Sequence, residues 1–262
     1  MNKPLIISPG NPLIKKVRAL RQKKARMESG MFLVEGIHHV GEVVSAGWDV
    51  DSVLYAPGLL TSDFARELVT RLADKPQPVS AQVMESMADK DNPQGIIAVV
   101  RQRKPELATL QPASMTRAAA LVSPQDPGNV GTILRTLDAV GADALFLLDR
   151  GVELYHPTVV RSSMGTIFWK TVIQTSFNEF VNWARQGNIQ LIGTSAHGIV
   201  DHRTFLPKVP WVLMLGNEQK GLSPEQINAC DVTVSVPMKG RVSSLNLAVA
   251  AGVLLYQFGD PN

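Results

Sequence analysis

The stretch Ala118-Ala-Ala-Leu-Val-Ser123-Pro-Gln-Asp-Pro-Gly-Asn129-Val-Gly131-Thr-Ile-Leu-Arg135 decides the fold class. Its apolar start, 118–122, predicts a buried strand, and a loop rich in proline and glycine leads from it into a helix expected over 130–140. The same order recurs to the end of the chain, with strands expected at 144–148, 190–194, 211–215 and 232–236 and helices at 157–164, 177–186, 224–228 and 244–256. Strands and helices that alternate in this way predict an α/β fold with a parallel sheet, whose ligands lie beyond the carboxyl ends of the strands.

The residues before this region predict a smaller α/β domain. Strands are expected at 31–34, 50–55 and 95–100, and helices at 36–46, 61–72 and 81–87. Residues 103–117 lack clear periodicity and contain Pro105 and Pro112, which suits a linker. We therefore predict a domain at residues 1–104, a linker at 105–117 and a second domain at 118–262.

The amino-terminal end carries most of the positive charge. The net charge of the 262-residue chain is +3, but residues 1–30 hold eight lysines and arginines against Glu28 alone, so this segment carries +7 and the rest −4. Apolar residues at helical spacing predict one amphipathic basic helix from Pro12 to Met27. Such a patch suits phosphate binding, and the expected RNA contacts are Lys15, Lys16, Arg18, Arg21, Lys23, Lys24 and Arg26. A solvated helix whose charges only keep the protein in solution explains the same pattern.

The composition excludes several classes of protein. Hydrophobic residues make up 45% of the chain, which excludes fibrous and disordered proteins. The single Cys230 excludes an intrachain disulfide and a zinc site built on several cysteines. No apolar run reaches the ~18 residues of a membrane helix, and the start lacks the apolar core of a signal peptide. We therefore expect a soluble, cytoplasmic protein with no membrane partner.

Two further loops that follow predicted strands are rich in polar residues. The first is Leu215-Gly-Asn-Glu-Gln-Lys-Gly-Leu222, and the second is Val236-Pro-Met-Lys-Gly-Arg-Val-Ser-Ser-Leu-Asn246. In the second loop Ser243 or Ser244 can cap the last helix, just as Asn129 can cap the helix after the first strand. The amide of Asn246 stands at the start of an apolar helix and therefore needs a hydrogen-bond partner.

These loops lack three common catalytic or binding motifs. Leu222 stands where a phosphate-binding loop has its lysine, which disfavours a nucleotide triphosphatase. The segment Gly128-Asn-Val-Gly131 lacks the glycine pattern of dinucleotide-binding folds. In Gly193-Thr-Ser-Ala-His197 a histidine replaces the second glycine of a nucleophile elbow, which disfavours a serine hydrolase.

Taken together, the three loops resemble the signature motifs of the SpoU/TrmH family in the SPOUT superfamily, the S-adenosylmethionine-dependent RNA ribose 2′-O-methyltransferases. The matching segments are Asn129-x-Gly131-x-x-x-Arg135-Thr136, Leu215-Gly216-Asn217-Glu218-x-x-Gly221-Leu222 and Pro237-Met238-x-Gly240-x-x-x-Ser244-Leu245-Asn246. The amino-terminal part, with Phe32-Leu-Val-Glu35-Gly36, is similar to the L30e-like substrate-binding domain of many members. The segment Arg161-Ser-Ser-Met-Gly165 resembles one in thiostrepton-resistance-type ribosomal methyltransferases.

The resemblance implies a trefoil-knotted, parallel-sheet SPOUT domain that binds S-adenosylmethionine, forms a homodimer and needs no metal. It implies that the cofactor pocket is lined by Thr194, Gly216, Val236 and Leu245. The catalytic residues that it implies are Asn129, Arg135, Glu218, Ser244 and Asn246, and Arg161 joins the expected RNA contacts. Because the pKa of an arginine lies above ~12, we expect Arg135 to clamp a phosphate and the developing oxyanion rather than to act as a base.

Three functions are compatible with these observations. The first is methyl transfer to a ribose 2′-hydroxyl of structured RNA, above all ribosomal RNA. The second is a non-catalytic, dimeric RNA-binding protein on the same scaffold, although the intact Arg135, Glu218 and Asn246 favour the enzyme. The third, a nicotinamide-dependent oxidoreductase, rests only on the alternation of strands and helices. The methylated nucleotide is not identified by the sequence, because RNA is recognised through shape and unpaired loops.

Overall fold

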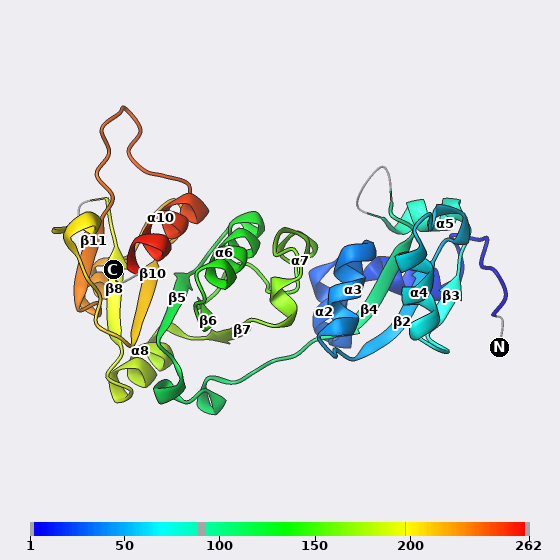
Figure 1. Cartoon of the computed structure of the whole chain (residues 1–262), viewed down its shortest axis with the longest axis horizontal. Helices are drawn as coiled ribbons and strands as arrows, with labels where there is room; N and C mark the ends of the chain where they lie inside the picture. The colour runs from blue at the N-terminus through cyan, green and yellow to red at the C-terminus, as the bar shows by residue number, and fades with distance from the viewer. Residues whose placement is uncertain (1–2, 89–92, 197, 260–262) are drawn as a thin grey trace. The chain divides into compact units, whose positions relative to one another are not determined.

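The chain folds into two compact units. The computed structural model describes residues 3–88, 93–196 and 198–259 (Figure 1). The first unit combines Met1–Arg103 with Leu154–Phe168, and the second combines Lys104–Glu153 with Trp169–Asn262. The segment that contains the expected helix 157–164 therefore packs with the first unit. The domain boundaries 1–104, 105–117 and 118–262 stay a prediction, and their outermost residues lie outside the described part of the chain.

The first unit is built on a four-stranded mixed sheet. Its order is β1-β4-β2-β3, in which β4 runs antiparallel to both β1 and β2, and β3 runs parallel to β2. The strands are β1 Met31–Glu35, β2 Val50–Tyr55, β3 Pro76–Pro78 and β4 Ile96–Arg101. The short β3 was not predicted, because a three-residue segment with two prolines gives no strand signal.

The helices of the first unit pack on this sheet with apolar residues that recur at helical spacing. They are α1 Pro12–Ala19, α2 Lys23–Ser29, α3 Ile37–Ser45, α4 Asp63–Arg71 and α5 Ala81–Met87, with a 3₁₀ turn at Pro57–Leu59. On one face, Ile14 and Val17 of α1 and Met84 of α5 share a buried cluster with Leu33 and Val99 of the strands. The apolar spacing that predicted these helices therefore marks the residues that they bury.

The prediction of one basic helix from Pro12 to Met27 is wrong, because the chain forms two helices. Residues Leu20, Arg21 and Gln22 donate their backbone N–H groups to carbonyls three residues earlier, which closes the last turn of α1. The guanidinium of Arg26 then donates to the carbonyls of Leu20 and Arg21, at 2.8 and 2.7 Å. These bonds satisfy carbonyls that a continuous helix would have used.

An aromatic cluster holds residues 154–168 in the first unit. This segment contains α7 Pro157–Ser162 and a 3₁₀ turn at Thr166–Phe168. The ring of Tyr155 lies 4.5 Å from that of Phe32, and the indole N–H of Trp48 donates to the carbonyl of Phe168 at 2.8 Å. The Tyr155 hydroxyl also accepts from the backbone N–H of Arg103 at 3.0 Å. Burial of this hydroxyl raises the pKa of Tyr155 to about 12, so it stays protonated.

The second unit contains a seven-stranded sheet in which every pair is parallel. Its order is β7-β6-β5-β10-β8-β11-β9. The strands are β5 Arg117–Val122, β6 Ala144–Leu148, β7 Thr171–Thr175, β8 Gln190–Thr194, β9 Val200–Asp201, β10 Trp211–Leu215 and β11 Val232–Ser235. The prediction of an α/β fold with a parallel sheet is confirmed. The edge strands β7 and β9 were missed, since β7 has a polar half and β9 has two residues.

Helices lie on both faces of this sheet (Figure 1). They are α6 Pro127–Ala139, α8 Phe177–Gln186, α9 Pro224–Asn228 and α10 Leu247–Gly259, with 3₁₀ turns at Leu107–Thr109, Pro112–Ser114 and His202–Thr204. On the α8 face, Phe146 of β6 packs against Phe180 and Trp183, with ring centroids 4.8 and 5.3 Å away. On the other face, α6 and α10 pack against each other. The sheet therefore has the two covered faces that near-continuous apolar strands require.

Candidate active site

The carboxyl ends of four neighbouring strands place the predicted loops along one edge of the sheet. Strand β10 lies between β5 and β8, and β11 follows β8. Leu215, the last residue of β10, is in register with Leu121 of β5, while Thr194 of β8 is in register with Val234 of β11. The loops that leave these strands therefore start close together, as expected for the ligand-binding edge of a parallel sheet.

The loop after β5 ends in a capped helix. Pro127 is the first helical residue of α6, and the carboxylate of Asp126 accepts the backbone N–H of Gly128 at 2.7 Å. The prediction that Asn129 caps this helix is wrong, because Asp126 has that position. Asn129 lies in the first turn and is 6% exposed, so its amide points into the protein and needs partners there.

Glu218 binds the loop after β10 to the loop after β5. Its carboxylate accepts the backbone N–H groups of Gln125 and Asp126, at 2.9 and 3.1 Å, and the side-chain amide of Asn129 at 3.2 Å. Partial burial would raise the pKa of Glu218, but these hydrogen bonds outweigh it and hold the pKa below its ordinary value. Glu218 is therefore ionised at neutral pH and acts as an acceptor.

Asn246 extends this network to the loop before α10. Its amide donates to Asn129 Oδ1 at 3.0 Å, and its own Oδ1 accepts the backbone N–H groups of Ala248 and Val249, at 2.9 and 3.3 Å. The prediction that the amide of Asn246 needs a partner is confirmed. Asn246, not Ser243 or Ser244, makes these capping bonds at the start of α10.

The loop after β10 is fixed by a close backbone approach. A Cβ atom on Gly216 would lie 2.2 Å from the carbonyl carbon of Gly221, so only glycine fits there. Asn217 donates its amide to the carbonyl of Ser123 at 2.9 Å and accepts the N–H of Gln219 at 3.0 Å. The bond from Asn217 to Ser123 was not predicted, although the Gly-Asn-Glu sequence is the signal for such a polar turn.

Two of the five expected catalytic residues stand apart from this network. Arg135 lies on α6, is exposed, and makes no hydrogen bond or ion pair with any residue that the structure describes. Ser244 is also exposed and has no hydrogen-bond partner within the described ranges. The structure thus brings together Asn129, Glu218 and Asn246, and it leaves Arg135 and Ser244 available to an external group.

Three of the four residues expected at the cofactor lie at the carboxyl ends of neighbouring strands, and Leu245 lies in the loop before α10. Thr194 ends β8, Gly216 follows β10 and Val236 follows β11. The hydroxyl of Thr194 donates to the carbonyl of Met214 at 3.0 Å, which ties the end of β8 to β10. Val236 and Leu245 are both half-buried. No group of three or more potential metal ligands is found among residues 3–88, 93–196 and 198–259.

The expected RNA contacts divide into exposed and bound side chains. Lys15, Lys16, Arg18, Lys23 and Lys24 are exposed on α1 and α2. Arg26 is 1% exposed and donates to backbone carbonyls, so it does not present its charge to a ligand. Arg21 is half-buried and lies 3.4 Å from a carboxylate oxygen of Glu35.

Arg161 lies on α7 in the first unit, where its carbonyl is 3.1 Å from His39 Nε2. In the described part of the chain, no helix has the length and apolar character needed to cross a membrane.

Comparisons with known proteins give a consistent result over most of the chain. The sequence profile of the SpoU rRNA Methylase family matches residues 117–256, and that of the MRM3-like substrate binding domain matches residues 11–98. The chain is 34% identical to the 23S rRNA (uridine(2479)-2′-O)-methyltransferase of Streptomyces viridochromogenes, over 91% of this chain and 85% of the relative. It is 28% identical to the 23S rRNA (guanosine(2553)-2′-O)-methyltransferase RlmP of Bacillus subtilis, over 96% and 97%.

A solved structure agrees with this comparison. The crystal structure of an AdoMet-bound rRNA methyltransferase from Sinorhizobium meliloti superposes with a TM-score of 0.88 at 32% sequence identity. The match covers 98% of this chain and 97% of that one, so it includes both units.

Proposed function

The chain belongs to the SpoU rRNA Methylase family, and we propose that its second unit transfers a methyl group from S-adenosylmethionine to a ribose 2′-hydroxyl of ribosomal RNA. The observation that carries this proposal is the hydrogen-bonded series Glu218–Asn129–Asn246, which joins three loops at the ligand-binding edge of the sheet. A nicotinamide-dependent oxidoreductase is excluded by the family. The non-catalytic alternative has no support, because the named relatives are methyltransferases.

The residues at the sheet edge fit S-adenosylmethionine. An adenine ring requires backbone hydrogen-bonding groups and apolar contacts, and the ends of β10, β8 and β11 offer three adjacent segments of backbone. Val236, directly after β11, and Leu245, two residues before α10, are both half-buried and supply apolar surface. We therefore assign Thr194, Gly216, Val236 and Leu245 to the cofactor. When bound, S-adenosylmethionine supplies an electrophilic methyl group.

The ribose is held by residues that are not bases. We propose that Arg135 binds the phosphate next to the reacting ribose and stabilises the charge that develops on the 2′-oxygen. A guanidinium suits this role because its N–H donors lie in one plane and it keeps its proton. Glu218 is a weak base at neutral pH, since three N–H groups lower its pKa. We propose that the proton of the hydroxyl passes to water or to an RNA phosphate oxygen while the bond from the sulfonium to the methyl group breaks and the bond from the 2′-oxygen to the methyl group forms.

Positioning of the ribose is the main contribution of this site. Nucleophile and methyl group react when they are held in line, which gives a large rate gain without an acid or a base. Glu218, Asn129 and Asn246 fix the first turn of α6, the helix that carries Arg135. We assign Ser244, two residues before Asn246, to the RNA side of the same site.

The first unit holds the RNA in this proposal. Its residues 11–98 match a substrate-binding domain, and α1 and α2 present the exposed Lys15, Lys16, Lys23 and Lys24. We also propose that the enzyme works in the cytoplasm, because the proposed substrate is ribosomal RNA. Arg18, Arg21 and Arg161 complete the assigned RNA contacts, and Arg26 is left out because it is buried.

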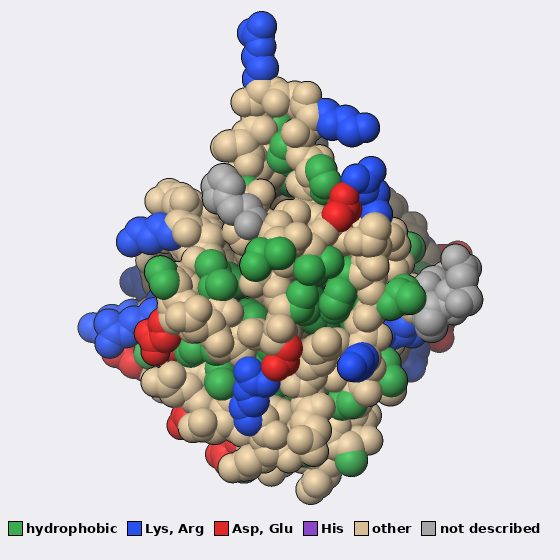
Figure 2. All heavy atoms as spheres, turned by 90° about the vertical axis from the view of Figure 1, so that its left-hand side faces the viewer, with side chains coloured by type: hydrophobic (Ala, Val, Ile, Leu, Met, Phe, Trp, Pro, Cys, Tyr) green, Lys and Arg blue, Asp and Glu red, His purple; other side chains and the backbone are tan. Residues whose placement is uncertain are grey.

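We also propose that the enzyme is a homodimer formed through α10. Val249, Val253 and Tyr256 are 52%, 39% and 63% exposed, and their spacing places them along one side of the helix. Figure 2 shows hydrophobic side chains gathered in the middle of one face of the second unit, below a loop that projects with basic side chains. Such a patch suits an interface between copies. Sedimentation of a Val253→Glu variant as a monomer, and of the wild type as a dimer, is the expected result.

The function is tested with labelled cofactor and whole ribosomal RNA. We expect transfer of label to one nucleotide, at which the RNA backbone resists alkaline cleavage because the 2′-oxygen is methylated. Label on a base, or no transfer to ribosomal RNA under conditions in which the protein binds S-adenosylmethionine, would contradict the proposal.

A further inference from the structure

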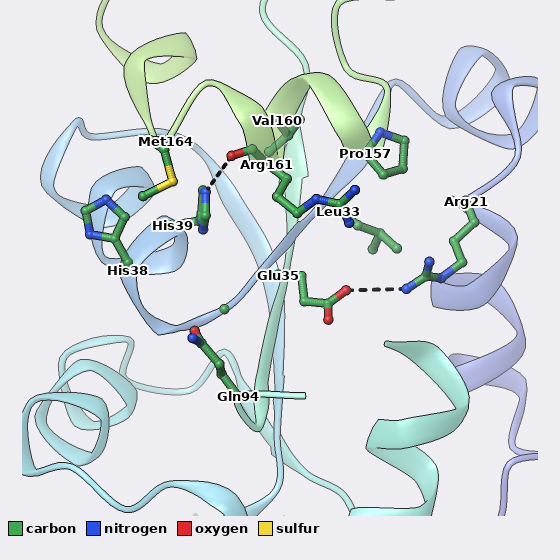
Figure 3. Close-up of a pocket in the computed structure, with 11 residues that line it drawn as sticks. Arg21, Leu33, Glu35, His38, His39, Gln94, Pro157, Val160, Arg161 and Met164 are labelled. Atoms are coloured by element: carbon green, nitrogen blue, oxygen red, sulfur yellow. Dashed lines mark hydrogen bonds and ion pairs between the residues drawn. The ribbon is translucent and has the colours of Figure 1, made fainter. Parts of the chain in front are cut away.

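The first unit contains a cavity that the methyl-transfer site does not use. Its volume is about 230 Å³, and it lies between β1, the start of α3 and α7 (Figure 3). A cavity of this volume has room for several water molecules or for one flat ring system. Leu33, Pro157 and Val160 form apolar parts of its wall.

Charged groups of both signs meet in this cavity. The carboxylate of Glu35 lies 3.4 Å from the guanidinium of Arg21, and both side chains are 23% exposed. Figure 3 shows the side chain of Arg161 extending from α7 and lying above Glu35 in this view. A ligand in the cavity therefore meets the Glu35 carboxylate, which accepts N–H groups, and the guanidinium groups of Arg21 and Arg161, which bind anions.

The polar wall of the cavity is already fixed in this structure. Gly36 has a φ of +99°, and a Cβ atom there would lie 2.8 Å from Gln94 Oε1. That oxygen accepts the backbone N–H of Ile37, the first residue of α3, at 2.9 Å. His39 Nε2 lies 3.1 Å from the carbonyl of Arg161, which ties α3 to α7. A site held in this way binds a ligand without first ordering its own side chains.

We propose that this cavity binds an unpaired guanine nucleotide of the RNA. Glu35 accepts hydrogen bonds from the base, and Arg161 binds the phosphate. The assignment of this nucleotide to the RNA substrate rests on the function proposed above. Guanine presents two adjacent N–H donors on its pairing edge, and the other three RNA bases do not. A carboxylate has about four acceptor positions, so the N–H donors of a base can bind it alongside its present partners or in exchange for part of those contacts. The rings of His38 and His39, with centroids 5.5 Å apart, offer aromatic surface of the kind that stacks on unpaired bases.

The direct test uses mononucleotides and the histidine rings as reporters. In titrations of the whole protein with GMP, the NMR signals of His38 and His39 shift, whereas the signal of His202, in the second unit, does not. UMP, CMP and AMP bind at least roughly tenfold more weakly, because they lack the paired donors that meet the carboxylate. Unshifted His38 and His39 signals, or equal affinity for GMP and UMP, would overturn the proposal.

Two variants with a matched control sharpen this test. Glu35→Gln keeps the shape of the side chain but replaces one acceptor with a donor, and we expect GMP affinity to fall at least roughly tenfold. The control Glu28→Gln removes an exposed carboxylate of α2 that does not line the cavity, and GMP affinity stays unchanged. If Glu35→Gln does not fold, Met164→Trp fills the cavity from a position that is 43% exposed and gives the same loss. Wild-type affinity for GMP in folded Glu35→Gln, or in Met164→Trp where that variant takes its place, would overturn the proposal.

A methylation assay separates this site from the proposed function. Glu35→Gln is expected to raise the KM for ribosomal RNA roughly tenfold, mostly without a change in kcat. If the wild type methylates RNA but GMP does not bind, the cavity proposal fails and the function stands. If GMP binds as described but no RNA is methylated, the guanine site stands and the proposed function fails.

Discussion

The loop junction of the second unit and the basic segment of the first use their polar side chains differently. At the junction, Glu218, Asn129 and Asn246 bind one another and the backbone at the starts of two helices. In the basic segment, by contrast, lysines such as Lys15 and Lys23 remain exposed, while Arg26 is buried and satisfies backbone carbonyls.

This difference separates groups that shape the protein from groups that remain exposed and available to an external partner. An arginine has five donors in a planar fork and can bridge two carbonyls where a helix ends, whereas a lysine is a flexible, strongly hydrated point charge. Arg26 and the lysines of the basic segment therefore differ in role although they carry the same charge: Arg26 binds backbone carbonyls, and the lysines remain in solvent. At the junction the same distinction sets Arg135, which is exposed, apart from the amides and the carboxylate that hold its helix.

The largest effect is expected from Arg135→Ala. Loss of a donor that stabilises developing charge costs about 10²–10³ in rate, so methyl transfer falls by at least that factor. Binding of S-adenosylmethionine is largely unchanged, because the assigned partners of Arg135 are the ribose and phosphate of the RNA. The measurements are single-turnover methyl transfer and calorimetric titration with the cofactor.

The variant Arg135→Lys is the matched control for charge. It keeps the positive charge but loses the bidentate geometry, and we expect activity between those of the wild type and the alanine variant. Near-normal turnover of Arg135→Ala would remove this residue from the site and leave only the bound network of the junction.

The next largest effect is expected from Arg26→Ala. The change leaves the carbonyls of Leu20 and Arg21 without these donors and opens a space in a buried position, so the first unit loses about 2–4 kcal/mol in free energy of unfolding. Thermal unfolding of the whole chain measures this loss. The exposed Arg18→Ala is the control and changes stability by less than about 0.5 kcal/mol. Equal stability of both variants would show that Arg26 is not a structural residue.

The sequence predicted the elements with strong local patterns and missed those that depend on distant contacts. Strands 144–148, 190–194 and 211–215 and helices 177–186 and 224–228 have the predicted bounds, because apolar runs and capping residues define them locally. The break at Leu20 was missed, since it depends on a guanidinium six residues later.

The candidate site shows the same limit. Because Asn246 precedes an apolar helix, the sequence predicts that its amide has a hydrogen-bond partner. That this partner is Asn129 depends on the packing of α10 against α6, which the sequence does not indicate. The cap of α6 was assigned to Asn129 instead of Asp126, because both residue types cap helices and three positions separate them. The packing of 154–168 with the first unit, and hence the cavity, had no local signal.

A smaller effect with a distinct pH dependence is expected from Glu218→Gln. The amide cannot accept from all three N–H donors, so activity falls roughly tenfold. Because folding lowers the pKa of Glu218 below 4.5, its contribution to stability is present above that pH and is lost as the pH falls through the folded-state pKa. The difference in melting temperature between wild type and variant therefore shrinks below about pH 4.5. A difference that stays constant from pH 7 to pH 3 would contradict the role of an ionised carboxylate.

The smallest effects are expected from the exposed lysines. A lysine that contacts an RNA phosphate lowers the slope of log affinity against log salt by about 0.7–0.9 when it is changed to glutamine. Lys15 and Lys23 lie on separate helices, so some of these changes will be silent, and Lys24 pairs with Glu28 at 3.9 Å and contributes less. Filter binding over a range of salt measures the slope, with the exposed Lys208→Gln in the second unit as control. If changing all four lysines of α1 and α2 leaves both affinity and slope at wild-type values, the basic segment is a solvated surface and RNA is held elsewhere.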